Sequence, residues 1–237
     1  MNDALGGVWT NNKSYDHILK IGKGQNQFDV ISRYNLLKGV KPDMFSDSHR
    51  FAHHLTSSQV MCYNYFRPLI NENRTMSDKL IRILEERHIH IPNNCICEFE
   101  ASNPLDNTSY DMAIGHAKFE IKFTEYGFGK AKSDERHKIK FETIYKDLIR
   151  RCICLKDEPD METFFRYYQL FRNILHIDSV GKYAIFIFPK GNKKCSNEIN
   201  DFYTLIDDKF KNNIQVWYWE DLLVGKEDCD FYKKYLR

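Results

Sequence analysis

The sequence has no long hydrophobic run. The longest candidate, residues 183–188, has the length of a buried strand and falls far short of the roughly 20 apolar residues of a membrane-spanning helix. No basic segment followed by an apolar one opens the sequence, so no secretory signal is expected. The seven cysteines form no regular disulfide framework. These absences predict a protein of the reducing cytoplasm that has no membrane partner.

The chain also lacks a strong net charge. Its 237 residues include 35 Lys and Arg against 33 Asp and Glu, which gives a formal net charge of +2. This balance excludes a strongly basic nucleic-acid coat protein but allows a local basic patch. Hydrophobic residues make up 42% of the sequence and aromatic residues 14%, which is enough for a packed core and excludes a disordered chain.

The spacing of apolar residues divides the chain into two parts. Residues 1–52 have weak periodicity interrupted by glycine and asparagine, which predicts an N-terminal arm or subdomain of short elements. From residue 53 the pattern tightens, and residues 53–237 are predicted to form one domain. Two helices are expected first, one capped by residues 56–58 and ended near Pro68, the other capped by residues 77–78.

Three short strands are expected after these helices. Tight turns separate segments of alternating polarity, which predicts an antiparallel meander at residues 95–100, 110–114 and 117–123. Helical and strand patterns then alternate, so the predicted fold class is α/β with a mixed central sheet flanked by helices. The later elements are expected at residues 144–152, 161–175 (capped by Asp160), 182–188, 199–210 and 214–219.

Three charged side chains are predicted to meet at one edge of this sheet. Asp111 lies near the start of one strand, and Glu120 and Lys122 share one face of the next strand, which folds back towards Asp111. Two carboxylates bind Mg²⁺ and leave positions for water and phosphate, while a lysine orients the water or neutralises developing charge. The set therefore suits hydrolysis of a phosphodiester, although a Glu-x-Lys pair alone is also common on exposed strands.

These three residues resemble the signature of the PD-(D/E)XK nuclease superfamily, which has the restriction-endonuclease-like fold. One departure is that Tyr110, and not proline, precedes Asp111. Further segments, in the same order, resemble motifs of one bacterial group of type II restriction endonucleases in this superfamily. These segments are residues 55–59, 62–69, 122–125 and 168–173, and the resemblance covers roughly residues 53–190.

The resemblance implies an αβββαβ core and a Mg²⁺-dependent DNA endonuclease, with Mn²⁺ as a substitute metal. Asp111 and Glu120 are then the expected metal ligands, and Lys122 is the expected catalytic lysine. A third acid often completes such sites. Glu100 is the candidate for this role, and Glu98 remains an alternative because it shares the same face of the predicted strand.

Further site residues are expected outside the strands. Gln169 and Arg172 match a family motif, which implies an active-site role for Gln169 and phosphate binding by Arg172, whose planar fork binds two oxygens. Gln59 is expected to brace the site or contact DNA from the first helix. Residues 118–156 carry 11 Lys and Arg against six Asp and Glu, so this basic segment is a candidate for phosphate contacts, although charge runs often serve only solubility. The predicted contacts within it are Lys130, Lys132 and Lys138.

The expected substrate is double-stranded DNA. A homodimer is expected when both strands are cut, because two-fold symmetry matches palindromic sites. The N-terminal residues 1–52 are the candidate reader of the DNA sequence. The alternatives are a structure-specific or repair nuclease, and a non-catalytic DNA-binding module derived from a nuclease. The intact set of carboxylates and lysine argues against such a module.

Overall fold

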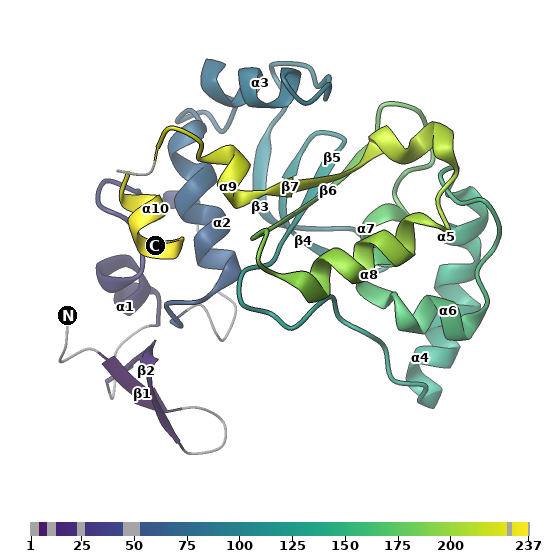
Figure 1. Cartoon of the computed structure of the whole chain (residues 1–237), viewed down its shortest axis with the longest axis horizontal. Helices are drawn as coiled ribbons and strands as arrows, with labels where there is room; N and C mark the ends of the chain where they lie inside the picture. The colour runs from purple at the N-terminus through teal and green to yellow at the C-terminus, as the bar shows by residue number, and fades with distance from the viewer. Residues whose placement is uncertain (1–4, 9–12, 23–26, 45–52, 227–228, 237) are drawn as a thin grey trace.

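The largest sheet in the described part of the chain has five strands (Figure 1). The computed structural model describes residues 5–8, 13–22, 27–44, 53–226 and 229–236. The strands lie side by side in the order β3, β4, β5, β6, β7, with antiparallel pairing up to β5 and parallel pairing beyond it. The predicted meander and the predicted α/β class with a mixed sheet are confirmed. The strands are β3 (Cys97–Ser102), β4 (Ser109–Ile114), β5 (Ala117–Ile121), β6 (Tyr183–Phe188) and β7 (Ile214–Tyr218).

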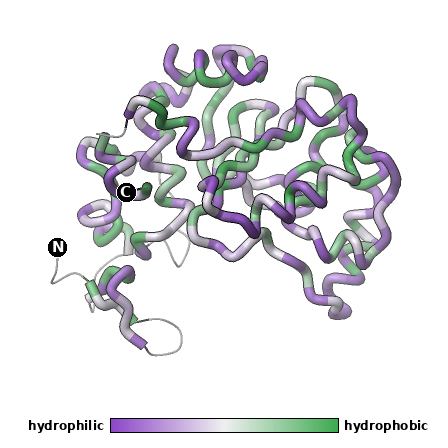
Figure 2. The backbone as a smooth tube through the Cα atoms, in the orientation of Figure 1, coloured by the Kyte–Doolittle hydropathy of each residue, from purple (hydrophilic) through white to green (hydrophobic). Residues whose placement is uncertain are grey.

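Two groups of helices pack against the two faces of the sheet (Figure 1). Side chains alternate along each strand, so Phe119 and Ile185 pack into the core of the first group, while Phe186 and Phe188 pack into the core of the second. Figure 2 shows the hydrophobic segments gathered along the central strands. The first group is α2 (Ser58–Phe66), α3 (Asp78–Glu85), α9 (Trp219–Leu222) and α10 (Asp230–Tyr235). The second is α5 (Lys146–Arg151), α6 (Met161–Arg166), α7 (Tyr168–Ile174) and α8 (Lys193–Tyr203). The helix α4 (Glu135–Lys140) lies ahead of this group and has no buried residue.

Three predicted helix starts are confirmed by their capping bonds. The side chains of Ser57, Ser77 and Asp160 each accept a hydrogen bond from a backbone N–H three residues further on, at 3.3, 3.4 and 2.7 Å. Each bond satisfies a donor that has no partner within the helix. Short polar side chains placed before an apolar period therefore determine where α2, α3 and α6 begin.

The single helix predicted over residues 161–175 is wrong, because Tyr167 interrupts it with φ −112° and ψ 32°. In a continuous helix the N–H of Gln169 would donate to the carbonyl of Phe165. Instead, the Gln169 N–H donates to the carbonyl of Gly129, and the Phe165 carbonyl accepts from the N–H of Ala131, both at 3.0 Å. The loop at residues 129–131 thus takes both backbone partners and separates α6 from α7.

The helix predicted over residues 199–210 has different bounds. It begins earlier and ends earlier, as α8, with Asn192 as its cap and Tyr203 as its last residue. A separate 3₁₀ turn follows at Asp208–Asn213. The helix predicted over residues 144–152 is observed as α5, which a π-helical segment (Phe141–Tyr145) joins to α4.

Short elements precede residue 53. They are β1 (Leu5–Val8), β2 (Ser14–Leu19), α1 (Gln27–Tyr34) and a 3₁₀ turn (Pro42–Met44). Asn64 of α2 accepts a hydrogen bond from the N–H of Leu37 at 2.8 Å and donates one to the carbonyl of Asn35 at 3.0 Å. The division of the chain at residue 52 stays a prediction, and residues 45–52 lie outside the described part.

Two further observations concern the whole described chain. All seven cysteines are free thiols. None of the described helices combines the length and the apolar character that crossing a bilayer requires.

An ion pair joins Asp43 to the end of α2. The buried Arg67 donates from Nε and Nη2 to the two carboxylate oxygens of Asp43, at 2.8 and 2.7 Å. Its Nη1 donates to the carbonyl of Ile70 at 3.0 Å. The hydrogen bond from Arg67 holds the pKa of Asp43 below its usual value, so the carboxylate is ionised at neutral pH.

The substitution Asp43→Asn is expected to lower the free energy of unfolding at pH 7 by about 1–2 kcal/mol, because the buried guanidinium loses its anionic partner. A carboxyl group with a lowered pKa stabilises the fold above its unfolded pKa, and this contribution disappears as the pH falls through the folded pKa. The difference in the free energy of unfolding between the unaltered protein and the Asp43→Asn variant should therefore narrow as the pH falls from 7 to below about 4. Urea unfolding across this range measures it.

Glu72→Gln is the matched control for this substitution. Glu72 pairs with Lys41 at 3.0 Å, but both side chains are exposed, so its loss is expected to change stability by less than about 0.5 kcal/mol. Equal losses of stability from the two substitutions would show that the burial of Arg67 does not strengthen its ion pair with Asp43.

Candidate active site

A cavity of about 660 Å³ opens where strands β3, β4 and β5 meet α2 and α7. Residues that the sequence places far apart line its wall together. The antiparallel meander supplies the carboxylates, and the first turn of α2 and the start of α7 supply amides. The predicted site residues in this wall are Gln59, Glu100, Asp111, Glu120, Lys122 and Gln169.

The register of β4 and β5 brings Asp111 and Glu120 together. Met112 pairs with Phe119, so Asp111 and Glu120 lie opposite each other one step further along the two strands. Opposite residues of an antiparallel pair share one face of the sheet. Oδ2 of Asp111 accepts a hydrogen bond from the backbone N–H of Ile121 at 2.6 Å, which fixes the carboxylate against β5.

Lys122 and Glu120 form a buried ion pair. Nζ of Lys122 donates to Oε1 of Glu120 at 2.7 Å, and the two side chains are only 11% and 6% exposed. Burial alone would lower the pKa of Lys122, but the charges of Glu120 and Asp111 outweigh burial and raise this pKa above its usual value. Lys122 is therefore protonated at neutral pH and acts as a hydrogen-bond donor and a positive charge.

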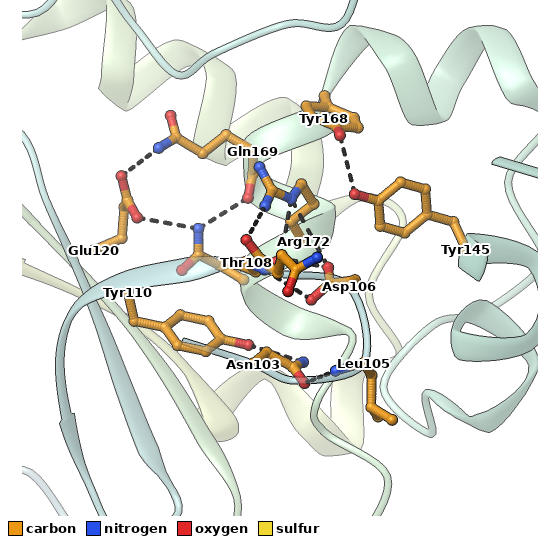
Figure 3. A network of polar contacts seen from close by, with 12 residues as sticks. Asn103, Leu105, Asp106, Thr108, Tyr110, Glu120, Tyr145, Tyr168, Gln169 and Arg172 are labelled. Carbon is orange, nitrogen blue, oxygen red and sulfur yellow. Dashed lines mark hydrogen bonds and ion pairs between the residues drawn. The ribbon is translucent and has the colours of Figure 1, made fainter. Parts of the chain in front are cut away.

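Two amides from α7 hold the same carboxylate. Nε2 of Gln169 donates to Oε1 of Glu120, and Nδ2 of Asn173 donates to Oε2 at 3.3 Å. Figure 3 shows the side chain of Gln169 reaching Glu120. Oε1 of Gln169 accepts in turn from the backbone N–H of Gly129 at 2.9 Å. Gln169 therefore links the loop that contains Gly129 to Glu120, and both oxygens of this carboxylate are fixed.

The site has an excess of negative charge. Burial, together with the nearby charges of Glu120 and Glu100, raises the pKa of Asp111 well above its usual value, despite the opposing effects of Lys122 and the Ile121 N–H. A divalent cation would neutralise this excess. The residues described contain no group of three or more His, Cys, Asp or Glu arranged to hold a metal. Mg²⁺ is commonly bound through only one or two carboxylates and keeps several waters, so Asp111 and Glu120 fit this ion.

Glu100, and not Glu98, lies in the cavity wall. The β3–β4 ladder pairs Phe99 with Met112 but has no pair at Glu100, whose φ is +52°. This left-handed backbone is unfavourable for a glutamate. Its carboxylate accepts a hydrogen bond from Ser109 at 3.2 Å. Glu98 is exposed and pairs with Ala113 further along the strand, so geometry favours Glu100 as the third acid, although its catalytic role stays a prediction.

Arg172 lies outside the cavity wall. Its Nε donates to Oγ1 of Thr108 at 2.9 Å and its Nη2 donates to the carbonyl of Asn107 at 3.2 Å, as Figure 3 shows for Thr108. These bonds hold the β3–β4 connection against α7. The predicted phosphate contacts of Arg172 and of the exposed lysines therefore stay predictions. Those lysines, which also lie outside the wall, are Lys130, Lys132 and Lys138.

Some residues of the site received no role from the sequence. Asn173 bonds Glu120 and is buried, and its spacing of four from Gln169 on one helix face was the available signal. Tyr15, His17 and His54 also line the cavity. No motif marked the first two, whereas His54 lies just ahead of the motif segment at residues 55–59, and that position was the available signal.

The substitution Gln169→Leu is expected to lower the rate of any reaction at this site by about 10²-fold, because small displacements of a catalytic group are costly. Substrate affinity should change little, since the amide holds Glu120 in place. Single-turnover kinetics at saturating substrate measure the effect. Arg166→Leu, on the exposed surface of α6, is the control and should leave the rate unchanged. An unaltered rate in the Gln169 variant would exclude the positioning role.

The fold and this site define a class of protein. A mixed sheet flanked by helices, with two carboxylates on adjacent strands and a lysine directly after the second strand, is the arrangement of a restriction-endonuclease-like core. The chain belongs to the family described as restriction endonuclease associating with ARP, whose model matches residues 35–236. This match confirms the resemblance to restriction endonucleases. No curated protein and no solved structure matches the chain.

Proposed function

We propose that the protein is a Mg²⁺-dependent endonuclease that hydrolyses phosphodiester bonds of double-stranded DNA. The observation that supports this most is the buried pair of Lys122 and Glu120 beside Asp111, in one cavity of a restriction-endonuclease-like fold. Burial and the neighbouring carboxylates raise the pKa of Asp111 and disfavour its ionised form. A DNA-binding module has no need of such a cluster next to a phosphate, whereas a catalytic metal site does.

Each residue has a definite task in this reaction. Asp111 and Glu120 would hold the metal, which when bound would activate water for attack and stabilise negative charge on the phosphate. Gln169 and Asn173 fix both oxygens of Glu120, so that the ligand geometry is set before DNA arrives. The protonated Lys122 orients the attacking water or donates to a phosphate oxygen as negative charge develops.

The finer assignment rests on the family. Membership of a restriction endonuclease family supports sequence-specific cleavage of the type II kind. We infer a cytoplasmic enzyme that acts as a homodimer, since two identical sites related by two-fold symmetry cut both strands of a palindrome. Mn²⁺ is expected to replace Mg²⁺. Phosphate contacts are assigned to the exposed Lys130 and Lys132, which follow Gly129 in the loop, and to the exposed Lys138 of α4.

The test is incubation of the protein with long unmethylated DNA, in Mg²⁺ and in EDTA, beside the variant Lys122→Ala. Discrete fragments that require Mg²⁺ and are absent with the variant are the expected result, and mapping their ends gives the recognition sequence. Cleavage restricted to branched DNA would indicate a repair nuclease. DNA binding without cleavage of any substrate would leave the non-catalytic module as the better description.

A further inference from the structure

A two-stranded ribbon from the N-terminal part of the chain contributes to the wall of the cavity. Its strands β1 and β2 are antiparallel, with Leu5 paired with Leu19 and Val8 with Ser14. In Figure 1 this ribbon extends below α1, away from the central sheet. Two side chains of β2, Tyr15 and His17, line the same cavity as the catalytic carboxylates.

Backbone hydrogen bonds fix one end of this ribbon. The N–H of Leu19 donates to the carbonyl of His53 at 3.1 Å, and the N–H of Leu55 donates to the carbonyl of His17 at 2.8 Å. Ile18 and Leu19 are buried, whereas Val8, at the other end, is 62% exposed. Residues 53–55 run directly into α2. The ribbon is thus held at the site and projects outwards from it.

A row of rings leads from the ribbon to the start of α2. Tyr15 and His17 are two residues apart and so share one face of β2. Their ring centroids are 5.5 Å apart, and the rings of His17 and His54 are 5.9 Å apart. Rings of this kind stack on bases, and their hydroxyl and ring nitrogens can hydrogen-bond base edges. This face of the ribbon is therefore chemically suited to a nucleic-acid groove.

The remaining surroundings of the cavity suit the DNA backbone. Gln169 lies in the wall contributed by α7, and its loop partner Gly129 is followed by the exposed Lys130 and Lys132. In Figure 1 the ribbon and α4 lie on opposite sides of the lower part of the molecule. Lysines bind phosphates without reading sequence, whereas side chains that reach into a groove read it. A two-stranded ribbon fits the major groove, which is about 12 Å wide.

We propose that the β1–β2 ribbon enters a groove of the DNA beside the scissile phosphate, and that Tyr15 and His17 contact bases there. This inference rests on the proposed function, because it requires DNA at the cavity. The ribbon determines which sequences are bound, and the carboxylates and Lys122 determine how fast they are cut. The N-terminal part of the chain is then a specificity element.

The experiment selects bound duplexes from a pool of random 20-base-pair DNA, using Lys122→Ala protein so that nothing is cut. The variant Tyr15→Ala/His17→Ala is compared with Asp16→Asn, which alters the opposite face of the same strand. The Lys122→Ala protein and its Asp16→Asn variant are expected to select one common sequence. The double variant is expected to lose preference at the contacted positions, by about tenfold or more at each.

Two outcomes would overturn the inference. The first is an unchanged selected sequence in the double variant. The second is equally weakened binding to all sequences with a smaller salt dependence, which would mark the rings as backbone contacts only. If the Tyr15→Ala/His17→Ala variant fails to fold, as judged by its melting temperature, Tyr15→Phe/His17→Gln replaces it. An unchanged selected sequence in this second variant also counts against base contacts.

Cleavage assays of the unaltered protein distinguish this inference from the proposed function. Sequence-selective binding that depends on the ribbon, without any cleavage, would reject the nuclease assignment and keep the ribbon's role. Cleavage at one sequence that does not change when Tyr15 and His17 are replaced would keep the nuclease assignment and reject the ribbon's role. Absence of DNA binding by the unaltered protein would reject both.

Discussion

Replacing Asp111 with asparagine is expected to abolish DNA cleavage and, in metal-free buffer, to make the folded protein more stable. Burial and two neighbouring carboxylates disfavour the charge of Asp111, so removing it relieves repulsion that the fold otherwise sustains. The asparagine oxygen can still accept from the Ile121 N–H. A gain of about 1–2 kcal/mol in the free energy of unfolding is expected. The cleavage rate should fall by about 10³-fold or more, since a metal ligand is lost.

Urea unfolding in EDTA and single-turnover cleavage in Mg²⁺ measure the two effects. Glu98→Gln is the control, because it removes an exposed carboxylate from the same sheet outside the cavity and should change neither quantity. Mg²⁺ should stabilise the unaltered protein, since a ligand that binds only the folded state raises stability, but it should not stabilise the asparagine variant. Cleavage at a normal rate by that variant would remove Asp111 from the site.

Lys122→Met is expected to lower the free energy of unfolding by about 3 kcal/mol, because it leaves the carboxylate of Glu120 buried without its cation. The amides of Gln169 and Asn173 still donate to Glu120, which keeps the loss at the lower end of the usual range. Cleavage should be lost as well, by about 10²–10³-fold, since a donor aimed at developing charge is removed. The double substitution Lys122→Met/Glu120→Gln removes both charges and should recover most of the stability without recovering cleavage.

This pair of variants separates folding from chemistry. If the double variant stays as unstable as the single one, the unpaired charge of Glu120 is not the cause of the loss. Lys146→Met serves as the control, because Lys146 pairs with Glu142 at an exposed position and its loss should cost less than about 0.5 kcal/mol.

The part of the site on the meander could be predicted because its geometry is local. Strand alternation and a tight turn determine the faces of Asp111, Glu120 and Lys122, so the sequence alone places them together. The interruption at Tyr167 could not be predicted in this way. It depends on backbone hydrogen bonds to residues 129–131, which are distant in sequence, while the apolar period continues across it.

The same reasoning explains the N-terminal contribution. Tyr15 and His17 reach the cavity because β2 bonds to residues 53–55, and no local pattern encodes that pairing. Arg172 shows the converse limit. Its match to a family motif predicted phosphate binding, but the structure also gives its guanidinium nearby partners in Thr108 and Asn107. Residue type and spacing identify a group that can bind phosphate, whereas its neighbours decide where it points.

The interrupted helix has a practical consequence. The N–H of Gln169 in α7 donates to the loop at residues 129–131, and the N–H of Ala131 in this loop donates to α6. The hydrogen exchange of these two amides therefore reports whether the loop is attached to the helices. Gln169 also holds Glu120, which means that the same two amides report on the assembly of the carboxylate site. Exchange measured with and without DNA can therefore follow the ordering of this site in the unaltered protein, with no residue of the site replaced.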